Sequence, residues 1–371
     1  MSATRSLRMI RAQRALLRIS ANLSDLDGPP AKNQTLRLRT DERLLWAISW
    51  RLSYKPNIMK ANLAFVFPGQ GSQSVGMLTE LAAAYPEVQQ AFNEASEGAG
   101  LDLWDLSQNG PEEKLNQTQN TQPALLAASV AVWRVWQVHS DAQPAQLSGH
   151  SLGEYAALVA SGALSLHDGA KLVRERGRLM QAAVPAGMGA MAAVLGAEDS
   201  VVEAICKEVS TPDSCIVPCN YNSPGQIVIG GHATALERAT AVLNERGVRK
   251  VIRVAMSVPS HTPLMRDAAT ELGQFMKTLA WSMPDRRVIQ NADVLVHGNI
   301  EAIQDALVRQ LYSPVRWTEC VQKLAANGAT HMAECGPGKV LSGLIKRIDK
   351  TLDARAIGSS AELSAALIEL A

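Results

Sequence analysis

Residues 145–162, "AQLSGHSLGEYAALVASG", decide the fold. The first six residues predict a short buried strand, and residues 152–162 predict a helix that Gly162 can close. Between them, "GHSLG" (149–153) matches the pattern G-x-S-x-G. The two glycines of this pattern allow a sharp turn from strand to helix that leaves the serine hydroxyl exposed. Ser151 is therefore a candidate nucleophile, and the alternative is a turn serine that caps the helix.

The alternation of strands and helices continues on both sides of this turn. "NLAFVF" (62–67) is an apolar run ended by Pro68-Gly69, which is typical of a buried strand running into a turn. Further segments predict helices at 121–137, 167–183 and 299–311, and strands at 288–292 and 331–335. We therefore expect an α/β fold with an α/β-hydrolase-like core, whose mainly parallel sheet is covered on both faces.

A second module interrupts this core. The pattern predicts the order β-α-β-β-α-β, with segments at 189–196, 200–209, 215–221, 225–231, 233–247 and 250–256. This order is that of a ferredoxin-like unit. We expect residues 188–256 to form a ferredoxin-like subdomain inserted in a catalytic core made of 59–187 and 257–371.

The first 58 residues differ from the rest of the chain. Residues 1–58 carry 11 Lys and Arg against 4 Asp and Glu, whereas residues 59–371 carry 25 against 31. An arginine-rich, acid-poor start is typical of an organelle transit peptide. The alternative is that the natural chain begins at Met59, where "MKANLAFVFPGQG" leads directly into a strand. On either explanation 1–58 is a basic extension outside the fold.

Composition excludes several classes of function. The chain has 371 residues, of which 47% are hydrophobic and 19% charged, so it can bury a core. With 4% aromatic residues and a slightly acidic body, nucleic-acid binding is not expected. No apolar run approaches the roughly 18 residues of a membrane span. The five cysteines lack CxxC spacing, so we expect small buried hydrophobes, no metal site and a reducing compartment, either the cytoplasm or, with a transit peptide, an organelle matrix.

A serine nucleophile needs a base. His150 directly precedes Ser151, and its side chain should diverge from that of the serine. His261 lies in "SVPSHTPLM" (257–265), where the chain returns from the inserted module. Such a loop lies near a cleft between modules, where sites tend to form. His261 is thus the candidate base, and a solvated loop histidine is the alternative.

Arg176 occupies an unusual position on the predicted helix 168–182. At 100° per residue it lies in the middle of the apolar side, opposite the charged residues. A cation on such a side must be paired or point into a cleft. Two readings stay open: a buried ion pair, or a receptor for a substrate carboxylate, which suits the planar guanidinium.

The chain resembles the malonyl-CoA:acyl-carrier-protein transacylases of fatty acid synthesis, especially the discrete bacterial enzymes. The resemblance covers about residues 61–350 and rests on seven motifs in family order. These are "FVFPGQGSQ" (65–73), "GHSLGEYAALVASGA" (149–163), "RGRLMQ" (176–181), "NSPGQIVIGG" (222–231), "VPSH" (258–261), "RQLYSPVRWT" (309–318) and "ECGPGKVLSGL" (334–344). The basic extension is the one departure from the family's pattern.

The resemblance implies roles for the catalytic positions. Ser151 would be the nucleophile and His261 its base. Gln310 would orient His261 through its side-chain or backbone carbonyl, in place of the usual carboxylate. Backbone N–H groups of Gln70 and Leu152 would form the oxyanion hole.

It also implies the substrate side of the site. Arg176 would hold the free malonyl carboxylate, and Asn220 and Asn222 would lie near the site on the side of the small module. Malonyl would pass from malonyl-CoA to Ser151 and then to the phosphopantetheine thiol of acyl carrier protein, without a metal or redox cofactor. Three alternatives remain: a free-standing acyltransferase of a polyketide assembly line, a serine thioesterase or hydrolase, and a non-catalytic scaffold.

Overall fold

The computed structural model describes residues 58–185, 187–254 and 258–370. The predicted basic extension lies outside these residues, apart from Ile58, which begins β1 (Ile58–Phe67). The predicted strand 250–256 is observed as β6 (Lys250–Arg253), and its last two residues lie outside the described ranges.

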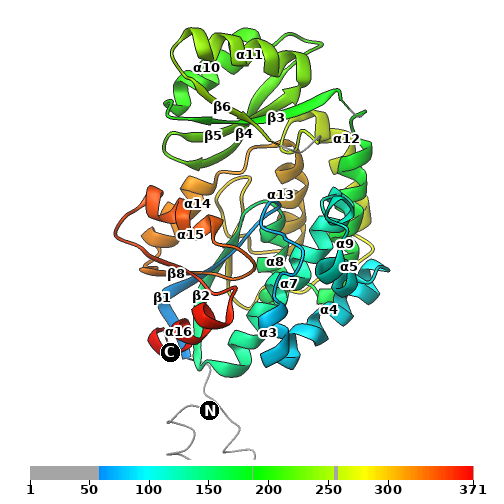
Figure 1. Cartoon of the computed structure of the whole chain (residues 1–371), viewed down its shortest axis with the longest axis vertical. Coiled ribbons are helices and arrows are strands. Elements are labelled where there is room, and N and C mark those ends of the chain that lie inside the picture. The colour runs from blue at the N-terminus through cyan, green and yellow to red at the C-terminus, as the bar shows by residue number, and fades with distance from the viewer. Residues whose placement is uncertain (1–57, 186, 255–257, 371) are drawn as a thin grey trace, which may run out of the picture. The chain divides into compact units, whose positions relative to one another are not determined.

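A five-stranded sheet lies at the centre of the larger of the two sheet-containing parts of the described chain (Figure 1). Its order is β7-β2-β1-β8-β9, and every pairing is parallel. Besides β1, the strands of this sheet are β2 (Ala142–Gly149), β7 (Arg287–Ile289), β8 (His331–Glu334) and β9 (Asp353–Ala356). This confirms the predicted α/β class with a mainly parallel sheet. β9 was not predicted from the sequence, because its four residues alternate charged and small side chains and give no apolar run.

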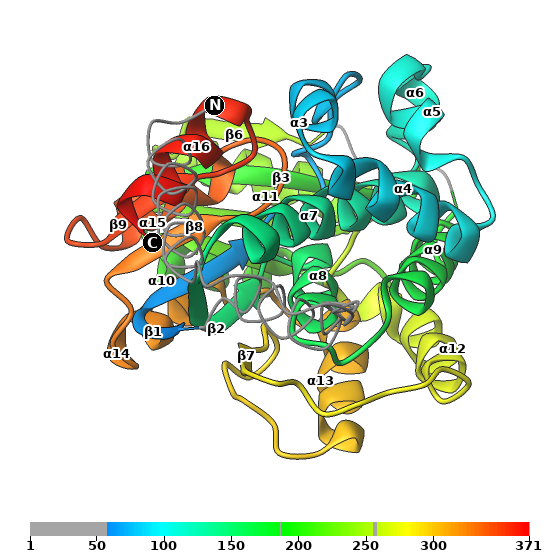
Figure 2. The same ribbon diagram turned by 90° about the horizontal axis from the view of Figure 1, so that it is seen from below.

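Helices cover both faces of this sheet (Figure 2). Along β1, Leu63, Phe65 and Phe67 belong to one buried cluster, whereas Ala64 and Val66 belong to another, as the period of two requires. The second cluster includes α14 (Trp317–Ala326) and α15 (Val340–Ile348). The first includes α3 (Thr79–Ala84), α4 (Pro86–Ala99), α5 (Leu103–Asn109), α6 (Glu112–Leu115), α7 (Thr118–His139), α8 (Leu152–Ala160), α9 (Leu166–Ala182), α12 (Arg266–Met276), α13 (Ile300–Tyr312) and α16 (Ser360–Glu369).

The inserted unit has the predicted β-α-β-β-α-β order. It consists of β3 (Gly189–Leu195), α10 (Asp199–Val209), β4 (Ile216–Ser223), β5 (Gln226–His232), α11 (Ala233–Glu245) and β6. The sheet order is β4-β5-β3-β6 and the pairings are antiparallel. Figure 1 shows α10 and α11 on one face of this sheet, where they bury the larger apolar cluster of the unit. Met191 and Val228 lie on the other face and line the cavity described below.

Candidate active site

Ser151 lies at the turn between β2 and α8, at the end of the sheet where the chain leaves β1, β2 and β7. Its backbone has φ of 52° and ψ of −105°, which few residues other than glycine adopt. Gly153 makes the turn possible, because a Cβ there would lie 1.9 Å from the carbonyl oxygen of Phe67. His150 N donates to that same oxygen at 3.0 Å. The serine is therefore held in a sharp turn packed directly against β1.

His261 faces the hydroxyl of Ser151. The distance from Ser151 Oγ to His261 Nε2 is 2.7 Å. On its other side, His261 Nδ1 lies 2.7 Å from the backbone oxygen of Gln310, and His261 N donates to the oxygen of Leu311 at 2.9 Å. These two carbonyls belong to the last turn of α13, where helix carbonyls have no partner within the helix. Since a carbonyl only accepts, Nδ1 carries the proton and Nε2 is free to accept from Ser151.

Burial keeps this imidazole neutral. The His261 side chain is almost fully buried, and burial, followed by the charge of Arg176, lowers its pKa to about 3. The carbonyl of Gln310 opposes this shift only partly. A neutral histidine with Nε2 directed at a hydroxyl has the protonation state that a general base requires.

Arg176 lies on α9 and is 1% exposed. Its Nη1 donates to Gln122 Oε1 at 2.9 Å, and its Nη2 lies 3.0 Å from Gln310 Oε1 and 3.3 Å from Ser151 Oγ. Among the described residues no Asp or Glu forms an ion pair with Arg176, and its buried Nε has no hydrogen-bond partner. The contacts of this buried cation beside the candidate nucleophile are therefore neutral: three oxygens, and the ring of Tyr155, whose centroid lies 5.2 Å from the guanidinium carbon.

The side chain and the backbone of Gln310 do different things. The resemblance implied that either the side-chain or the backbone carbonyl of Gln310 would orient His261, and the hydrogen bond comes from the backbone. The side-chain amide instead donates to Ser151 O at 2.9 Å and to Glu154 Oε2 at 3.0 Å. Gln310 thus contacts both members of the Ser151–His261 pair and Arg176.

The remaining predicted residues line one cavity of about 160 Å³ with Ser151, Arg176 and His261. Asn222 accepts a hydrogen bond at Oδ1 from His150 Nε2, 2.8 Å away. His150 is thus engaged with the small sheet, and burial lowers its pKa. The cavity is lined by Gln70, His150, Ser151, Leu152, Arg176, Met180, Met191, Asn220, Asn222, Val228, Val254, Ser260 and His261.

Four polar residues that support this site were not predicted from the sequence. Asn291 Oδ1 accepts from Ser151 N at 2.9 Å, and Asn291 N donates to Glu154 Oε2 at 2.7 Å. Gln290 Nε2 donates to Glu154 Oε1 at 3.0 Å, and Gln122 contacts Arg176. Burial raises the pKa of Glu154 to about 7, although the hydrogen bonds from Gln290, Asn291 and Gln310 lower it. The available signal was weak: polar residues directly after a buried strand, and a glutamine and a glutamate within apolar helices.

Within the described ranges no group of three His, Cys, Asp or Glu side chains is arranged to hold a metal ion. No helix in those ranges is both long and apolar enough to cross a membrane.

Known proteins match this chain over nearly all of its described part. Residues 64–367 match the family "Acyl transferase domain". The malonyl CoA-acyl carrier protein transacylase of Salmonella typhimurium is 52% identical over 306 residues, which are 82% of this chain and 99% of that protein.

Solved structures agree with this match. The malonyl-CoA:acyl carrier protein transacylase of Xanthomonas oryzae pv. oryzae is 63% identical, with a TM-score of 0.83, over 84% of this chain and 99% of that one. A malonyl-transacylase solved in complex with a type II PKS acyl-carrier protein is 49% identical, with a TM-score of 0.81, over 83% of this chain and 99% of that one. The chain therefore belongs to the acyl transferase domain family and, within it, to the malonyl CoA-acyl carrier protein transacylases.

Proposed function

We propose that this acyltransferase moves malonyl from malonyl-CoA to the phosphopantetheine thiol of acyl carrier protein, through a malonyl ester on Ser151, and so supplies fatty acid synthesis. One observation carries the choice of substrate. Arg176 is buried beside Ser151 and, among the described residues, has no carboxylate partner. An unpaired buried cation is costly, and a planar guanidinium suits a carboxylate. The malonyl carboxylate supplies the missing partner.

In the first half-reaction His261 Nε2 takes the proton of Ser151 Oγ as this oxygen attacks the thioester carbonyl. We propose that the backbone N–H groups of Gln70 and Leu152 stabilise the tetrahedral oxyanion, where one such donor is typically worth ~10²–10³ in rate. The coenzyme A thiolate then leaves with the proton from His261, and the malonyl ester remains on Ser151.

In the second half-reaction the carrier-protein thiol gives its proton to His261 and attacks the ester. Ser151 leaves with that proton, and malonyl-carrier protein is released. The protonated imidazole appears twice in this cycle. Because Gln310 O lies at the negative end of α13, it favours this cation without a carboxylate. Two half-reactions at one site predict ping-pong kinetics.

Other assignments are part of the same proposal. Asn220 and Asn222 form the small-subdomain wall of the substrate site, and the subdomain comprises 188–256 within a core of 59–187 and 257–371. The reaction moves an acyl group and protons only, so we propose that it needs no metal or redox cofactor. A cytoplasmic location suits both substrates.

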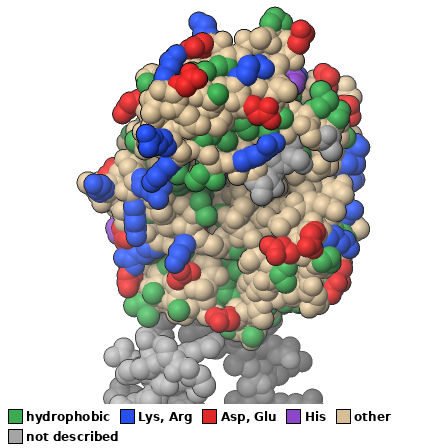
Figure 3. Space-filling model, turned by 45° about the horizontal axis from the view of Figure 1, so that its top comes forward, with side chains coloured by type: hydrophobic (Ala, Val, Ile, Leu, Met, Phe, Trp, Pro, Cys, Tyr) green, Lys and Arg blue, Asp and Glu red, His purple; other side chains and the backbone are tan. Residues whose placement is uncertain are grey.

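Both carriers present malonyl on a phosphopantetheine arm, which bears phosphate. Figure 3 shows Lys and Arg side chains gathered along its left edge, on the side where Figure 1 places α14 and α15. Lys339 and Lys346 line a surface cavity of about 490 Å³, together with Glu362 and with Arg355, which is ion-paired with Asp353 and Glu369. Such basic groups attract anionic substrates.

The test is a two-step transfer followed by mass spectrometry. Incubation with malonyl-CoA should add one malonyl group to the enzyme, and addition of phosphopantetheinylated carrier protein should move that group to the carrier. Release of free malonate at a comparable rate without any thiol acceptor would favour a hydrolase and count against the proposal.

A second candidate is a polyketide transferase, because one relative was solved with a type II PKS acyl-carrier protein. Comparing kcat/KM for a fatty acid carrier protein and a polyketide carrier protein separates the two. Clear preference for the polyketide carrier would replace fatty acid synthesis as the role of this chain.

A further inference from the structure

Glu154 is a buried carboxylate surrounded by neutral donors. It lies on α8, is 0% exposed and is not among the residues that line the cavity of Ser151. Its Oε1 accepts from Gln290 Nε2 at 3.0 Å, and its Oε2 accepts from Asn291 N at 2.7 Å and Gln310 Nε2 at 3.0 Å. Three hydrogen-bond donors and no cation in direct contact make this an unusual place for a charge.

The contact with Gln310 decides which way an amide points. With Nε2 directed at Glu154 and at Ser151 O, the amide presents Oε1 to Arg176 at 3.0 Å. A turn of the amide by 180° would place its NH₂ against the guanidinium, donor against donor. It would also place Oε1 against the carboxylate. The ionised form of Glu154 accepts only, so this form excludes the turned amide.

Through Asn291, Glu154 Oε2 also supports the backbone of Ser151. Glu154 Oε2 fixes Asn291 N, and Asn291 Oδ1 accepts from Ser151 N at 2.9 Å. Asn291 Nδ2 donates to Gly149 O at 2.8 Å, on the other side of the turn. Glu154 thus reaches Arg176 through Gln310 and reaches Ser151 through Asn291.

We propose that Glu154 is a positioning residue for malonyl selection: it locks the Gln310 amide so that Arg176 is held, through a neutral oxygen, in line for a substrate carboxylate. This inference rests on the proposed function, in which Arg176 binds the malonyl carboxylate. It predicts that Glu154→Gln, whose side chain has nearly the same shape as that of glutamate, loses selectivity for malonyl.

Glu154→Gln introduces an NH₂ group among donors. On the Oε2 side this group would face Gln310 and Asn291 N, and on the Oε1 side it would face Gln290. Each choice leaves a buried donor opposed by another donor, which is costly. An NH₂ group on the side towards Gln310 would displace the Gln310 amide, which in turn contacts Arg176.

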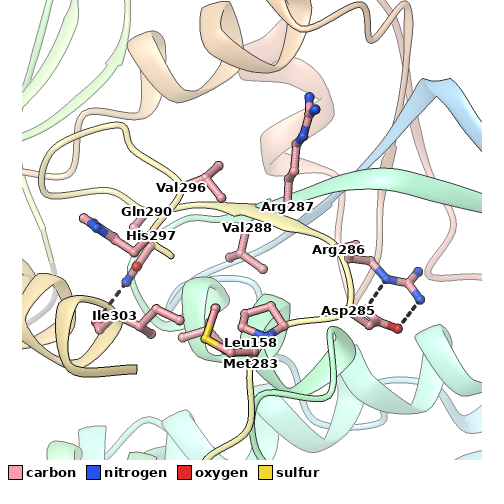
Figure 4. Close-up of a pocket in the computed structure, with 11 residues that line it drawn as sticks. Leu158, Met283, Asp285, Arg286, Arg287, Val288, Gln290, Val296, His297 and Ile303 are labelled. Atoms are coloured by element: carbon pink, nitrogen blue, oxygen red, sulfur yellow. Dashed lines mark hydrogen bonds and ion pairs between the residues drawn. The ribbon is translucent and has the colours of Figure 1, made fainter. Parts of the chain in front are cut away.

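Gln290 offers a way to repair the variant. It lines a second cavity of about 250 Å³, where Figure 4 shows its amide bonded to Ile303. Gln290→Glu places an acceptor opposite the new NH₂ at position 154, and it loses the hydrogen bond that Gln290 Nε2 donates to Ile303 O at 3.2 Å. In the double variant the oxygen at position 154 can again accept from Gln310 and Asn291 N, so the original orientation of Gln310 should return.

Glu334 provides the matched control. It is also 0% exposed and also accepts three donors, which are Leu341 N, Ser342 N and Ser342 Oγ. None of these groups lines the cavity of Ser151. Glu334→Gln therefore measures what the loss of a buried, donor-surrounded carboxylate does to stability alone.

The experiment measures kcat/KM for acylation by malonyl-CoA and acetyl-CoA, together with Tm, on wild type and the three variants. Glu154→Gln should lower the malonyl-to-acetyl ratio by about five- to tenfold, the upper end of what one ordinary hydrogen bond contributes. The double variant should return the ratio to within about threefold of wild type. Glu334→Gln should lower Tm and leave the ratio unchanged.

Two results would overturn the inference while leaving the proposed function intact. One is a wild-type ratio in Glu154→Gln with a lowered Tm, and the other is a double variant that regains Tm but not the ratio. A wild-type enzyme without preference for malonyl is a different result, because it overturns the receptor role of Arg176 itself. If Glu154→Gln does not fold, the double variant still decides, since it must show the wild-type ratio.

Discussion

Arg176 Nη2 lies 3.3 Å from Ser151 Oγ. Malonyl carries its carboxylate one methylene away from the thioester carbonyl, so a receptor for the carboxylate and a nucleophile for the carbonyl must be close neighbours. An ester on Ser151 therefore keeps its free carboxylate within reach of the guanidinium. In the proposed function, this closeness distinguishes the site from that of a general esterase.

The first prediction concerns the ester itself. Ser151→Ala should show no mass increase after incubation with malonyl-CoA, because the attacking oxygen is absent. Wild type should gain one malonyl group under the same conditions. Retained labelling of the variant would place the nucleophile elsewhere.

The second prediction concerns substrate choice. Arg176→Ala should lower kcat/KM for malonyl-CoA by about ten- to hundredfold relative to acetyl-CoA, since a charged hydrogen bond is worth ~1.5–3 kcal/mol. Arg176→Lys should recover little, because an ammonium group cannot reproduce the planar fork. An equal loss for both thioesters, or an unfolded variant, would favour a structural role for Arg176.

The third prediction concerns the amide that holds Arg176 from α7. Gln122→Leu removes the acceptor of Arg176 Nη1. We therefore expect kcat/KM for malonyl-CoA to fall by about three- to tenfold relative to that for acetyl-CoA. Gln143→Leu is the control, because Gln143 is equally buried on β2 and its amide atoms have no hydrogen-bond partner in the described part of the chain. It should leave selectivity unchanged and be neutral or stabilising. Similar selectivity in all three proteins would argue against a role for Gln122.

The fourth prediction concerns acid stability. The pKa of His261 falls from 6.5 to about 3 on folding, so below pH 6.5 the unfolded chain binds a proton that the folded chain does not. The resulting penalty is absent above about pH 6.5, grows as the pH falls and is complete near pH 3. At pH 5 it should reach ~2 kcal/mol. Urea unfolding of wild type and His261→Asn at pH 7.5 and 5 should show wild type losing this much more, and parallel losses would count against a neutral buried imidazole.

The fifth prediction concerns the turn that carries Ser151. Gly153→Ala would place a Cβ 1.9 Å from the Phe67 oxygen, so the variant should lose both activity and several degrees in Tm. Gly343→Ala is the control, because a Cβ at this position in α15 meets nothing within 4 Å. It should keep activity and gain stability by about 0.5–1 kcal/mol. Full activity in Gly153→Ala would show that the turn does not need its close approach to β1.

Much of this fold could be predicted because its strands are apolar and its turns carry glycine and proline. The order of the inserted unit and the helix of Arg176 followed from periodicity alone. The support for the site could not be predicted in this way. Glu154 and Asn291 meet only because β7 lies beside β2, and no local pattern encodes that pairing. Motif resemblance supplied Gln310, although not the division of labour between its backbone and its amide.

Ser151 and His261 share one more property: both have positive φ, 52° and 63°. Backbone of this kind in a residue other than glycine costs roughly 1–3 kcal/mol, and here two such residues lie at the two ends of one 2.7 Å hydrogen bond. Selection for greater folding stability alone would tend to replace either residue with glycine. With the roles proposed for Ser151 and His261, the chain is therefore held below its attainable stability by its catalytic pair, and selection for thermostability without a test of activity should yield inactive variants.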